Sequence, residues 1–508
     1  MSNHLFGAIR ASSGVDDKPF IETLDGGRFT YGDLWRASGR AANALAALGV
    51  KPGDRVAAQV EKHPLALVIY LACARAGAIF LPLNTAYTPA EVGYFLGDAE
   101  PGLFICDPAR REQLAQAAAA AKVARVETLG ADGQGSMADR IAAAPDAFAD
   151  IARGPDDLAA ILYTSGTTGR SKGAMLSHDN LLSNSLTLRD YWRFTDRDVL
   201  IHALPIFHTH GLFVATNVLL LAGGSLIFMP KFDADLVMRA MPRATSMMGV
   251  PTFYTRLLDH PGLSRDATSH MRLFVSGSAP LLAETHRAWR GRTGHAILER
   301  YGMTETNMNT SNPYDGERVA GTVGFPLPGV SLRVVDPDSG GPLARDAIGM
   351  IEVKGPNVCK GYWRMPEKTE AEFRKDGFFI TGDLGKIDEA GYVHIVGRGK
   401  DLIITGGFNV YPKEIETEID ALPGVMESAV IGAPHRDFGE GVIAVVVRQA
   451  GAALDERSIL SALQDRLAKF KLPKRAIIVD DLPRNTMGKV QKNLLRDQHR
   501  DIFNTPAS

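Results

Sequence analysis

The sequence has few of the residues that mark secreted, metal-binding or nucleic-acid-binding proteins. Only three of its 508 residues are cysteines, and Cys73, Cys106 and Cys359 lie too far apart for a CxxC motif or a disulfide framework. We interpret them as small buried thiols in a reducing compartment, and we expect a cytoplasmic protein. The formal net charge is only -2 and no basic tract is present, which argues against binding to nucleic acid.

Long apolar runs are also missing. The most apolar stretch, residues 213–230, is uncharged but shorter than the ~20 residues of a membrane-spanning helix, and Asn217, Gly223 and Gly224 interrupt it. We interpret it as a buried helix that turns into a buried strand. The first ten residues contain no apolar stretch of secretory length, and the last four form neither a prenylation nor a peroxisomal signal. We therefore expect no membrane span.

Alternating apolar segments predict the fold class of the first two-thirds of the chain. With 508 residues, 45% of them hydrophobic, the chain can bury a large core and should form more than one domain. Expected strands at 55–60, 79–83 and 102–106 alternate with expected helices at 65–76, 91–98 and 117–121. Alternation of this kind indicates crossover connections and an α/β fold with largely parallel sheets.

The last third of the chain has a different pattern. From about Gly324 the expected strands become shorter and glycine becomes frequent, which predicts an antiparallel or β-barrel-like subdomain. A compact α+β unit is expected after Arg398. Its expected helices are 414–419 and 458–470, and its expected strands are 428–431, 442–447 and 476–479. We place the domain boundary at Gly399-Lys400, which gives a large domain of residues 1–398 and a small domain of residues 399–508.

Residues 163–173 form the most informative segment of the sequence. Its glycines allow backbone N–H groups to approach an anion, its hydroxyls donate hydrogen bonds, and Arg170 and Lys172 are positively charged. An apolar run at 158–162 precedes it, so we expect the loop to follow a buried strand, where ligands bind in α/β proteins. A flexible surface loop is the alternative. The segment is not a Walker A motif, because Ser171 occupies a position where that motif requires glycine.

This segment resembles the phosphate-binding motif of the AMP-forming acyl-CoA synthetases, which belong with luciferases and nonribosomal-peptide adenylation domains to the adenylate-forming superfamily. Four further motifs follow in the order of that family, at residues 301–305, 381–383, 397–401 and 483–489. The resemblance implies a large N-terminal domain of stacked α/β subdomains with a β-barrel-like subdomain, and a small mobile C-terminal α+β domain. It also implies ligation of an acid to CoA through an acyl-adenylate, with ATP and Mg2+.

The resemblance assigns most of the site residues. Glu305 and Thr164 are the implied Mg2+ ligands, since Mg2+ is held by carboxylate oxygens and phosphates. Lys489 is implied to bridge the acid carboxylate and the α-phosphate, which suits a point charge on a long stem. The implied phosphate cradle is Thr164, Ser165, Gly166, Thr167, Thr168, Gly169 and Lys172. The implied contacts of adenine and the α-phosphate are Ser278, Ala279, Glu299, Arg300, Tyr301, Gly302, Met303 and Thr304.

The C-terminal motifs resemble those that contact the ribose and guide CoA. Asp383 and Arg398 match the ribose contacts, and a carboxylate suits a vicinal diol because it only accepts hydrogen bonds. An Asx turn and a surface salt bridge are the alternatives for these two residues. In the family the C-terminal domain rotates for the second half-reaction about a hinge that matches Lys400. Gly406 and Gly407 then leave room for the pantetheine arm of CoA, with a hairpin turn as the alternative.

The acid substrate is predicted from a residue beside the adenine motif. Arg300 stands where relatives that use aromatic or fatty acids typically have glycine. A guanidinium there shortens the pocket and requires a partner, which the second carboxylate of a short diacid would supply. Arg256 is expected on a helix that borders the pocket, or else on the surface. His208 matches a position between the acid and the CoA channel, and a metal site at His208 and His210 is not supported by further ligands.

Over essentially its full length the chain resembles the malonyl-CoA synthetases, which implies malonate as the acid and methylmalonate as a second acid to test. Three alternatives remain open. They are a synthetase for another short acid, an adenylation enzyme that loads a carrier protein, and a non-catalytic nucleotide-binding protein. The resemblance also implies that a lysine acetyltransferase and a deacetylase act on Lys489, because acetylation removes the charge needed for adenylation.

Overall fold

The structure is a computed structural model that describes residues 3–164, 171–405, 408–435, 438–464, 466–467, 469–485 and 488–503, without the side chain of residue 409. The chain divides into two compact units, which are described separately. The first unit comprises Met1–Leu332 and Val353–Phe379, and the second comprises Arg333–Glu352 and Ile380–Ser508.

The first unit contains two mixed sheets. One sheet has the strand order β6-β5-β3-β4-β7-β8, in which β6, β5, β3, β4 and β7 are parallel and β8 is antiparallel to β7. Its strands are β6 (Val126–Thr128), β5 (Leu103–Cys106), β3 (Arg55–Gln59), β4 (Ile79–Pro82), β7 (Leu158–Thr164) and β8 (Lys172–Ser177). The nearby helices are α2 (Tyr31–Ala47), α3 (Pro64–Ala76), α4 (Pro89–Ala99), α5 (Arg111–Ala120) and α6 (Ser136–Ala143).

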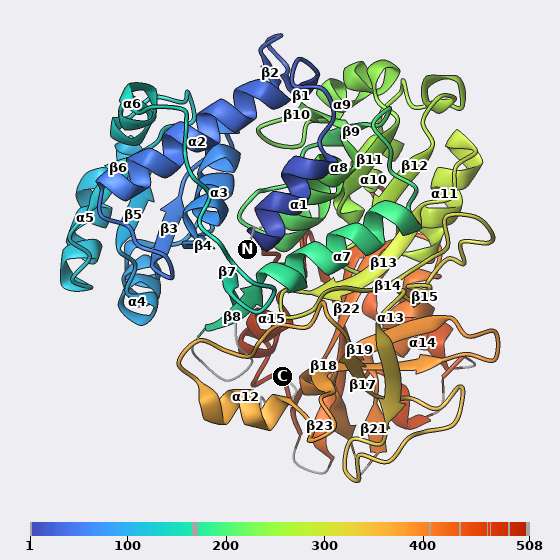
Figure 1. Cartoon of the computed structure of the whole chain (residues 1–508). Helices are drawn as coiled ribbons and strands as arrows, with labels where there is room; N and C mark the ends of the chain where they lie inside the picture. The colour runs from blue at the N-terminus through green and yellow to red at the C-terminus, as the bar shows by residue number, and fades with distance from the viewer. Residues whose placement is uncertain are drawn as a thin grey trace. The chain divides into compact units, whose positions relative to one another are not determined.

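The helices of this sheet cover both of its faces. Figure 1 shows α2 and α3 side by side above the strands, α4 below them and α5 to their left. Apolar residues of β3, β4 and β5 pack with those of α4 and α5 in one buried cluster. The strands and helices predicted between residues 55 and 121 are confirmed, with bounds that differ by a few residues. The predicted strand before the glycine-rich segment is β7, which is buried over most of its length.

The second sheet of this unit has the order β15-β14-β13-β12-β11-β9-β10-β1-β2. The neighbours from β13 to β1 are parallel, so their carboxyl ends share one edge. Its strands are β15 (Phe325–Pro326), β14 (Asn307–Ser311), β13 (Leu298–Met303), β12 (Leu273–Ser276), β11 (Ser246–Gly249), β9 (Val199–His202), β10 (Ser225–Phe228), β1 (Pro19–Thr23) and β2 (Arg28–Thr30). In open α/β sheets, ligands bind at this edge, outside the carboxyl ends of the strands.

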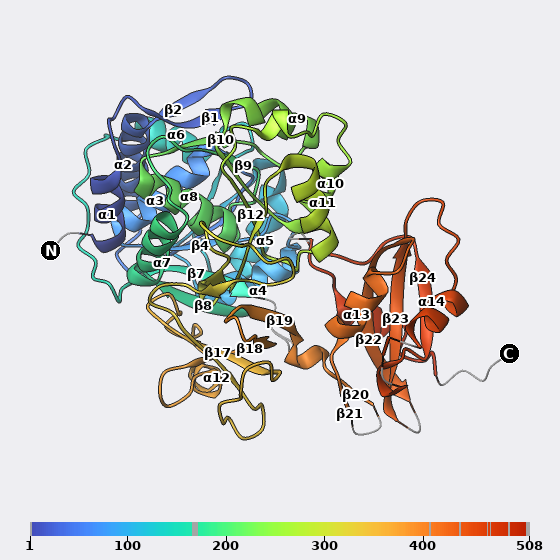
Figure 2. The ribbon, with the colours of Figure 1, turned by 90° about the vertical axis from the view of Figure 1, so that its right-hand side faces the viewer.

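Helices also flank the second sheet. They are α1 (His4–Ser12), α7 (His178–Tyr191), α8 (Thr216–Ala222), α9 (Ala234–Ala240), α10 (Pro251–Leu258) and α11 (Ala283–Thr293), and Figures 1 and 2 show them around the strands. A π-helix, His210–Ala215, leads directly into α8. The apolar stretch at 213–230 is therefore a buried helix that turns into the buried strand β10, as predicted.

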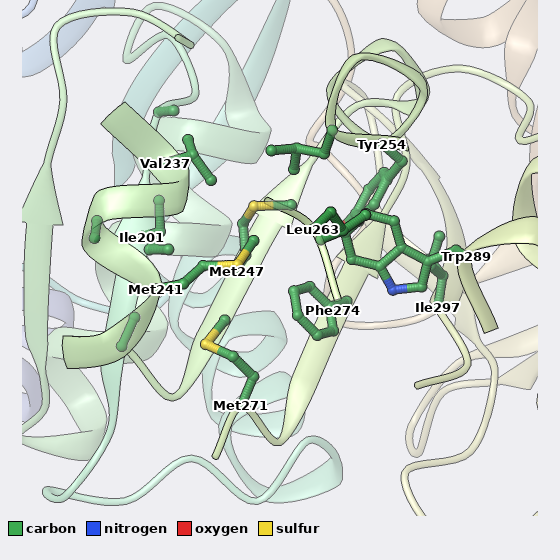
Figure 3. Packing of buried hydrophobic residues seen from close by; sticks show 14 of the residues in the cluster. Ile201, Val237, Met241, Met247, Tyr254, Leu263, Met271, Phe274, Trp289 and Ile297 are labelled. Atoms are coloured by element: carbon green, nitrogen blue, oxygen red, sulfur yellow. The ribbon is translucent and has the colours of Figure 1, made fainter. Parts of the chain in front are cut away.

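A large apolar cluster fixes α9, α10 and α11 on the sheet. Figure 3 shows Tyr254, Phe274 and Trp289 gathered within it. The Trp289 ring packs edge-on against the other two rings, with centroid distances of 5.0 Å, a geometry favoured by aromatic quadrupoles. The Tyr254 hydroxyl donates a 2.6 Å hydrogen bond to the Val275 carbonyl. This packing fixes α10 against β12 and thereby one wall of the site described below.

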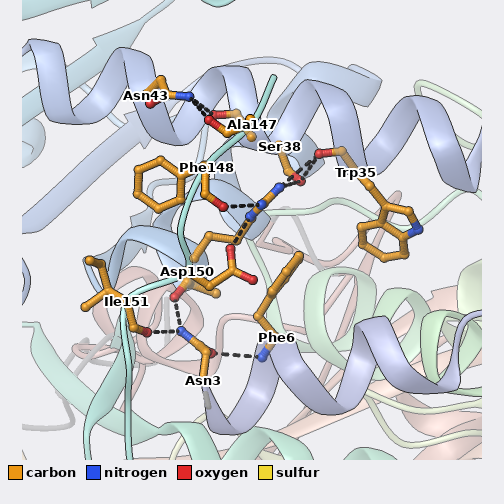
Figure 4. Close-up of polar contacts among 12 residues, drawn as sticks. Asn3, Phe6, Trp35, Ser38, Asn43, Ala147, Phe148, Asp150 and Ile151 are labelled. Atoms are coloured by element: carbon orange, nitrogen blue, oxygen red, sulfur yellow. Dashed lines mark hydrogen bonds and ion pairs between the residues drawn. The ribbon is translucent and has the colours of Figure 1, made fainter. Parts of the chain in front are cut away.

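Polar side chains fasten the segment that leads into β7. Figure 4 shows the contacts around residues 145–151. Arg75 pairs with Asp150 at 2.6 Å and also donates to the carbonyls of Trp35 and Phe148. Asn3 donates to the Ile151 carbonyl at 2.9 Å. These long-range contacts hold residues 148–151, which precede β7 in the chain, against α1, α2 and α3.

The second unit contains parts of a four-stranded sheet whose strand order is β16-β17-β18-β19. Its strands are β16 (Ser331–Val335), β17 (Gly349–Lys354), β18 (Phe379–Ile387) and β19 (Val393–Arg398). The short helix α12 (Pro366–Glu372) lies between β17 and β18 in the chain but belongs to the first unit. The sequence predicted an antiparallel or barrel-like subdomain here. Within the described residues this is an open sheet and not a closed barrel, because the two edge strands, β16 and β19, do not pair with each other.

The rest of the second unit is a compact α+β fold. The sheet order is β21-β20-β23-β22, with β24 parallel to β23. The elements are β20 (Ile403–Thr405), β21 (Phe408–Val410), α13 (Pro412–Asp420), β22 (Val425–His435), β23 (Gly439–Arg448), α14 (Glu456–Leu463), β24 (Arg475–Val479) and α15 (Lys492–Gln498). Apolar residues of α13 and α14 pack on one face and those of α15 on the other.

The predicted helix 458–470 was too long. α14 ends at Leu463, whose carbonyl accepts hydrogen bonds from the N–H groups of both Arg466 and Leu467 in the turn that follows. Elsewhere in this unit the predicted elements are confirmed with extended bounds. The three cysteines are buried thiols, as predicted. Among the described helices, none has the length and hydropathy needed to cross a bilayer.

Candidate active site

The glycine-rich segment joins the two strands of a hairpin. Thr164 ends β7, Lys172 begins β8, and the two residues face each other in the antiparallel register. Between them, the predicted phosphate contacts Ser165, Gly166, Thr167, Thr168 and Gly169 lie outside the described residues. The hairpin leaves the carboxyl end of a strand that is parallel to β4. The position of the segment therefore agrees with its expected place at a strand end.

Glu305 and Thr164, the two predicted Mg2+ ligands, lie together. The Thr164 hydroxyl is 3.3 Å from Glu305 Oε1, although 141 residues separate them in the chain. Glu305 is 5% exposed and follows β13 in the turn before β14. A carboxylate and a hydroxyl oxygen are hard donors of the kind that Mg2+ prefers. No cluster of three or more His, Cys, Asp or Glu side chains suited to a metal occurs in the described part of the chain.

Lys172 is held by partners that the sequence did not predict. Its ammonium group lies 2.8 Å from Glu372 Oε1 and 4.2 Å from the centroid of the Tyr362 ring. The Tyr362 hydroxyl contacts the Glu372 carboxylate and lies 3.2 Å from Glu305 Oε1. Burial and the charge of Glu305 raise the pKa of Tyr362, so the hydroxyl keeps its proton. These contacts connect the phosphate-loop lysine to the predicted metal ligand.

The predicted adenine contacts come from two adjacent segments. Ser278, two residues after the end of β12, has a left-handed backbone with φ of 71°. Such strain in a non-glycine residue is typical of ligand sites. Glu299 Oε1 accepts a hydrogen bond from the Leu281 backbone at 3.2 Å, which ties β13 to this turn. At Gly302 an added Cβ would lie 1.9 Å from the Asn307 carbonyl oxygen, so only glycine fits there.

The other members of the adenine motif surround these positions. Ala279, Tyr301, Met303 and Thr304 are half-buried. The pairing of β13 with β14 shifts between Tyr301 and Gly302. Such an irregularity redirects the side chains that follow it.

Arg300 is a buried cation. It is 3% exposed, and its Nε and Nη2 atoms have no hydrogen-bond partner among the described residues. Its guanidinium lies against Gly277, where an added Cβ would meet Arg300 Cζ at 2.3 Å. Burial lowers the pKa of Arg300 to about 9, so it stays charged at neutral pH. A buried charge without a partner is costly, and its donors are therefore available to an anion.

Two imidazoles lie beside Arg300. Burial, with a contribution from the Arg300 charge, lowers the pKa of His208 to about 4 and places that of His210 well below its ordinary value. Both rings are therefore neutral at physiological pH. His210 Nδ1 lies 3.2 Å from the Ser278 hydroxyl, and its Nε2 atom is buried without a partner in the described structure. The sequence predicted His208 here but assigned no role to His210.

Arg256 is separate from this group. It lies on α10, where its side chain is exposed, whereas Tyr254 on the same helix is buried and contributes to the electrostatic surroundings of Arg300. The helix borders the Arg300 site as predicted, but through Tyr254. The exposure of Arg256 agrees with the alternative of a surface arginine.

The predicted ribose contacts lie together in the second unit. Asp383 on β18 and Arg398 on β19 are paired in the antiparallel register, and Arg398 Nε lies 2.7 Å from Asp383 Oδ1. The Thr381 hydroxyl oxygen accepts a 3.1 Å hydrogen bond from the Asp383 backbone. Asp383 is 4% exposed, so water reaches little of the carboxylate in this ion pair. The carboxylate is oriented by Arg398 and by the turn at Gly382, whose φ is 72°.

Lys489 is part of a tight turn in the second unit. The backbones of Asn485 and Lys489 are joined by a 2.9 Å hydrogen bond, and the Asn485 side chain accepts from the Lys489 N–H at 2.9 Å. The side chain of Lys489 reaches solvent. The predicted hinge residue Lys400 lies in the short helix Gly399–Asp401. Gly406 and Gly407, predicted to line the CoA channel, lie outside the described residues.

Sequence reasoning missed the supporting residues of the site. Tyr362 and Glu372 contact Lys172 from about 190 and 200 residues away, and no spacing or motif indicates such a pairing. Gly277 could have been noticed, because it precedes the predicted contact Ser278, but the sequence does not show that Arg300 lies against it.

The first unit places the hydroxyl that ends β7 beside a carboxylate, and the second unit separately holds a carboxylate–arginine pair. These are residue types that suit Mg2+ and a ribose. A family model for the AMP-binding enzymes matches residues 10–363, and a model for the C-terminal domain of AMP-binding enzymes matches residues 414–489. The chain therefore belongs to the AMP-binding enzymes of the adenylate-forming superfamily.

Several relatives are similar over nearly the whole chain. ATP-bound MatB from Rhodopseudomonas palustris is 68% identical, with a TM-score of 0.97, and the match covers 99% of this chain and 100% of that chain. A feruloyl-CoA synthase from an Amycolatopsis species is 38% identical over 476 residues, which is 93% of this chain and 94% of the relative. A malonate–CoA ligase from Arabidopsis thaliana is 35% identical over 454 residues, which is 83% of this chain and 74% of the relative.

Proposed function

We propose that this chain is an AMP-forming malonyl-CoA synthetase. In the first step a carboxylate oxygen of malonate attacks the α-phosphorus of ATP, and pyrophosphate leaves. In the second step the CoA thiol loses its proton and its sulfur attacks the acyl carbon, so that AMP leaves and malonyl-CoA forms. Membership of the AMP-binding enzymes and the similarity to malonate–CoA ligases support this reaction.

The residues around Arg300 determine the specificity for the acid. Arg300 Nε and Nη2 and His210 Nε2 are buried nitrogen atoms that lack partners in the described structure. The second carboxylate of malonate supplies acceptors for these donors with the planar geometry that a guanidinium prefers. An aromatic acid such as ferulate would leave the buried charge without a partner. The same chemistry makes methylmalonate a second acid to test, since its branch leaves both carboxylates in place.

Product analysis tests this function. Purified protein is incubated with ATP, Mg2+, CoA and malonate, and the products are separated and identified by mass spectrometry. We expect malonyl-CoA, AMP and pyrophosphate in equal amounts. Formation of ADP and phosphate, or a faster reaction with ferulate than with malonate, would contradict the proposal.

We further propose the role of each site residue in this reaction. Glu305 and Thr164 supply oxygen ligands for Mg2+, and their 3.3 Å separation fits a shared cation. The hairpin that includes Lys172 cradles the phosphates. Ser278, Ala279, Glu299 and residues 300–304 surround the adenine and α-phosphate. Asp383 and Arg398 position the ribose, and Lys489 neutralises charge at the α-phosphate during adenylation.

The two half-reactions need different surroundings for the same acyl carbon. We propose a large domain of residues 1–398, a mobile domain of residues 399–508, and a hinge at Lys400. After adenylation the small domain turns, which removes Lys489 and brings residues 406–407 to the path of the CoA arm. The catalytic set is thus Lys489, Thr164, Glu305 and His208, with His208 between the acid and the CoA channel. We place the reaction in the cytoplasm, where the buried thiols stay reduced.

Gly277 is expected to be required for the acid site. In Gly277→Ala the added methyl group would meet the Arg300 guanidinium at 2.3–2.6 Å, so the guanidinium must move. A displacement of about 1 Å can lower a rate by ~10²-fold, and we expect kcat/KM for malonate to fall at least about tenfold, with the KM for ATP retained. Steady-state kinetics check this.

The double variant Gly277→Ala/Arg300→Gly provides the control. Because both changes act through one guanidinium, their effects should not add. Normal malonate kinetics in Gly277→Ala, or fully additive losses in the double variant, would show that Gly277 does not position Arg300.

Acetylation of Lys489 is expected to stop adenylation. Desolvation and the nearby charge of Arg398 lower the pKa of Lys489 to about 8, although its side chain reaches solvent. A larger fraction of the amine is therefore neutral near pH 7.5, and the neutral amine is the form that attacks an acetyl thioester. We propose that a lysine acetyltransferase modifies this residue and that a deacetylase restores it. The modification removes the charge and the ammonium donors.

Mass spectrometry and activity measured on the same sample test the acetylation. Protein is treated with acetyl-CoA and an acetyltransferase, and then with a deacetylase. We expect activity to fall in proportion to occupancy at Lys489 and to return on deacetylation. Full occupancy with unchanged activity, or loss of activity with acetylation only at other lysines, would contradict this expectation.

A further inference from the structure

Lys62 and His202 form a buried polar pair near the π-helix. The sequence analysis assigned no role to either residue. Lys62 follows β3 and is 9% exposed, and His202 ends β9 and is fully buried. Lys62 Nζ lies 2.8 Å from His202 Nδ1 and donates to the His202 carbonyl oxygen at 2.7 Å. It also lies 4.4 Å from the centroid of the Phe228 ring. Burial holds the pKa of Lys62 well below its ordinary value.

The hydrogen-bond directions of this pair are determined by its acceptors. His202 Nε2 lies 2.9 Å from the Gly211 carbonyl oxygen. A carbonyl only accepts, so Nε2 carries the proton and Nδ1 must accept from Lys62. The ammonium or amine of Lys62 is thereby satisfied without any carboxylate. The pair is a directed chain from Lys62 through His202 to Gly211.

Gly211 belongs to the π-helix beside Arg300. Its carbonyl also accepts from the Thr216 hydroxyl at 2.9 Å. The N–H at the other end of the same peptide unit, on Leu212, donates to the His208 carbonyl at 2.9 Å. One peptide unit is therefore held at its oxygen by His202 and at its nitrogen by the backbone of His208. π-helical turns cost stability and are often found at functional sites.

We propose that Lys62 and His202 are positioning residues for acid binding. They fix the peptide unit of Gly211, and through it the orientation of His208 and His210 toward Arg300. A buried amine and imidazole that served only to fill the core would be less stable than apolar side chains of similar volume. The inference rests on the proposed function, because it assumes that the acid binds beside Arg300.

The first test is Lys62→Met, which removes the donors and keeps the stem. Loss of a buried hydrogen bond to a polar network changes an equilibrium by about 10- to 100-fold, and we expect the KM for malonate to rise by that factor. The KM for ATP should stay within about twofold, since the contacts of the pair in the described structure do not include Thr164 or Lys172, the two described ends of the phosphate hairpin. The control is Lys51→Met, a change at an exposed lysine, which should leave both values unchanged.

Conservative variants separate positioning from general stability. In His202→Gln the side-chain amide can still donate to the Gly211 carbonyl, so we expect a malonate KM between those of the wild type and His202→Leu. Thermal melting is measured for every variant. A lower melting temperature with an unchanged malonate KM, or an equal rise in the KM for ATP, would overturn the inference.

The outcomes also separate this inference from the proposed function. If the wild type does not activate malonate, the proposed function fails before any variant is compared. If the wild type uses malonate and Lys62→Met or His202→Leu does not fold, His202→Gln decides. A folded His202→Gln protein with an elevated malonate KM and a normal ATP KM supports the inference, and wild-type kinetics overturn it.

Discussion

Replacement of Arg300 with glycine is expected to reduce kcat/KM for malonate by about 10²- to 4 × 10³-fold, while ATP binding is retained. Removing one partner of a buried ion pair costs ~3–5 kcal/mol, and each 1.4 kcal/mol corresponds to a factor of about ten. The pair in question forms only when malonate is bound, because Nε and Nη2 of Arg300 lack partners in the described structure. The loss therefore appears in substrate use.

The stability of this variant distinguishes a substrate contact from a structural one. Without substrate, Arg300 is a buried charge whose Nε and Nη2 lack hydrogen-bond partners within the described residues, and its removal relieves a desolvation cost. We expect the melting temperature of Arg300→Gly to stay at the wild-type value or to rise. Longer monocarboxylates should become usable, because the pocket gains volume. Near-normal kcat/KM for malonate would show that Arg300 does not bind the second carboxylate.

Replacement of Lys489 with alanine is expected to lower malonyl-adenylate formation by at least about 10³-fold, since a charge that acts mainly in the transition state is lost. Thioester formation from supplied malonyl-adenylate should largely survive. The reason is that Lys489 serves only the domain orientation used for adenylation. The two half-reactions are measured separately, by pyrophosphate release and by malonyl-CoA formation.

A matched control for this variant is Lys474→Ala, which removes another exposed lysine of the second unit. It should change neither half-reaction. Equal losses in both half-reactions of Lys489→Ala would contradict the use of two domain orientations.

The sequence predicted local elements well where one physical signal dominated. The strand β7 could be predicted because an apolar run precedes a segment rich in glycine and hydroxyl residues. The expected span of α3 was also confirmed, and the helix ends at Gly77, whose φ is 67°. The helix expected at 458–470 was too long, because apolar spacing does not distinguish an α-helix from a helix followed by a tighter turn. The structure ends α14 at Leu463 and forms a short helix at Lys469–Lys471.

The motifs indicated which residues to expect in the site, but not the contacts that support those residues. Glu305 and Thr164 were assigned together from resemblance, and the structure brings them within 3.3 Å. The pairing of Lys172 with Glu372 spans 200 residues and depends on how β8 and α12 pack. His210 was passed over because spacing alone could suggest only metal ligation. In the described structure His210 Nε2 has no partner, and this depends on how the π-helix packs beside the segment after β12. Residue spacing alone does not show that packing.

The most direct test of the central claim is ATP–pyrophosphate exchange with a panel of acids. Acetate, propionate, malonate, methylmalonate, succinate and ferulate are compared at equal concentration with the wild type and with Arg300→Gly. We expect malonate to give the highest wild-type exchange and this preference to disappear in Arg300→Gly. Wild-type exchange that is as high with acetate, propionate or ferulate as with malonate would contradict the assignment of Arg300 to a second carboxylate.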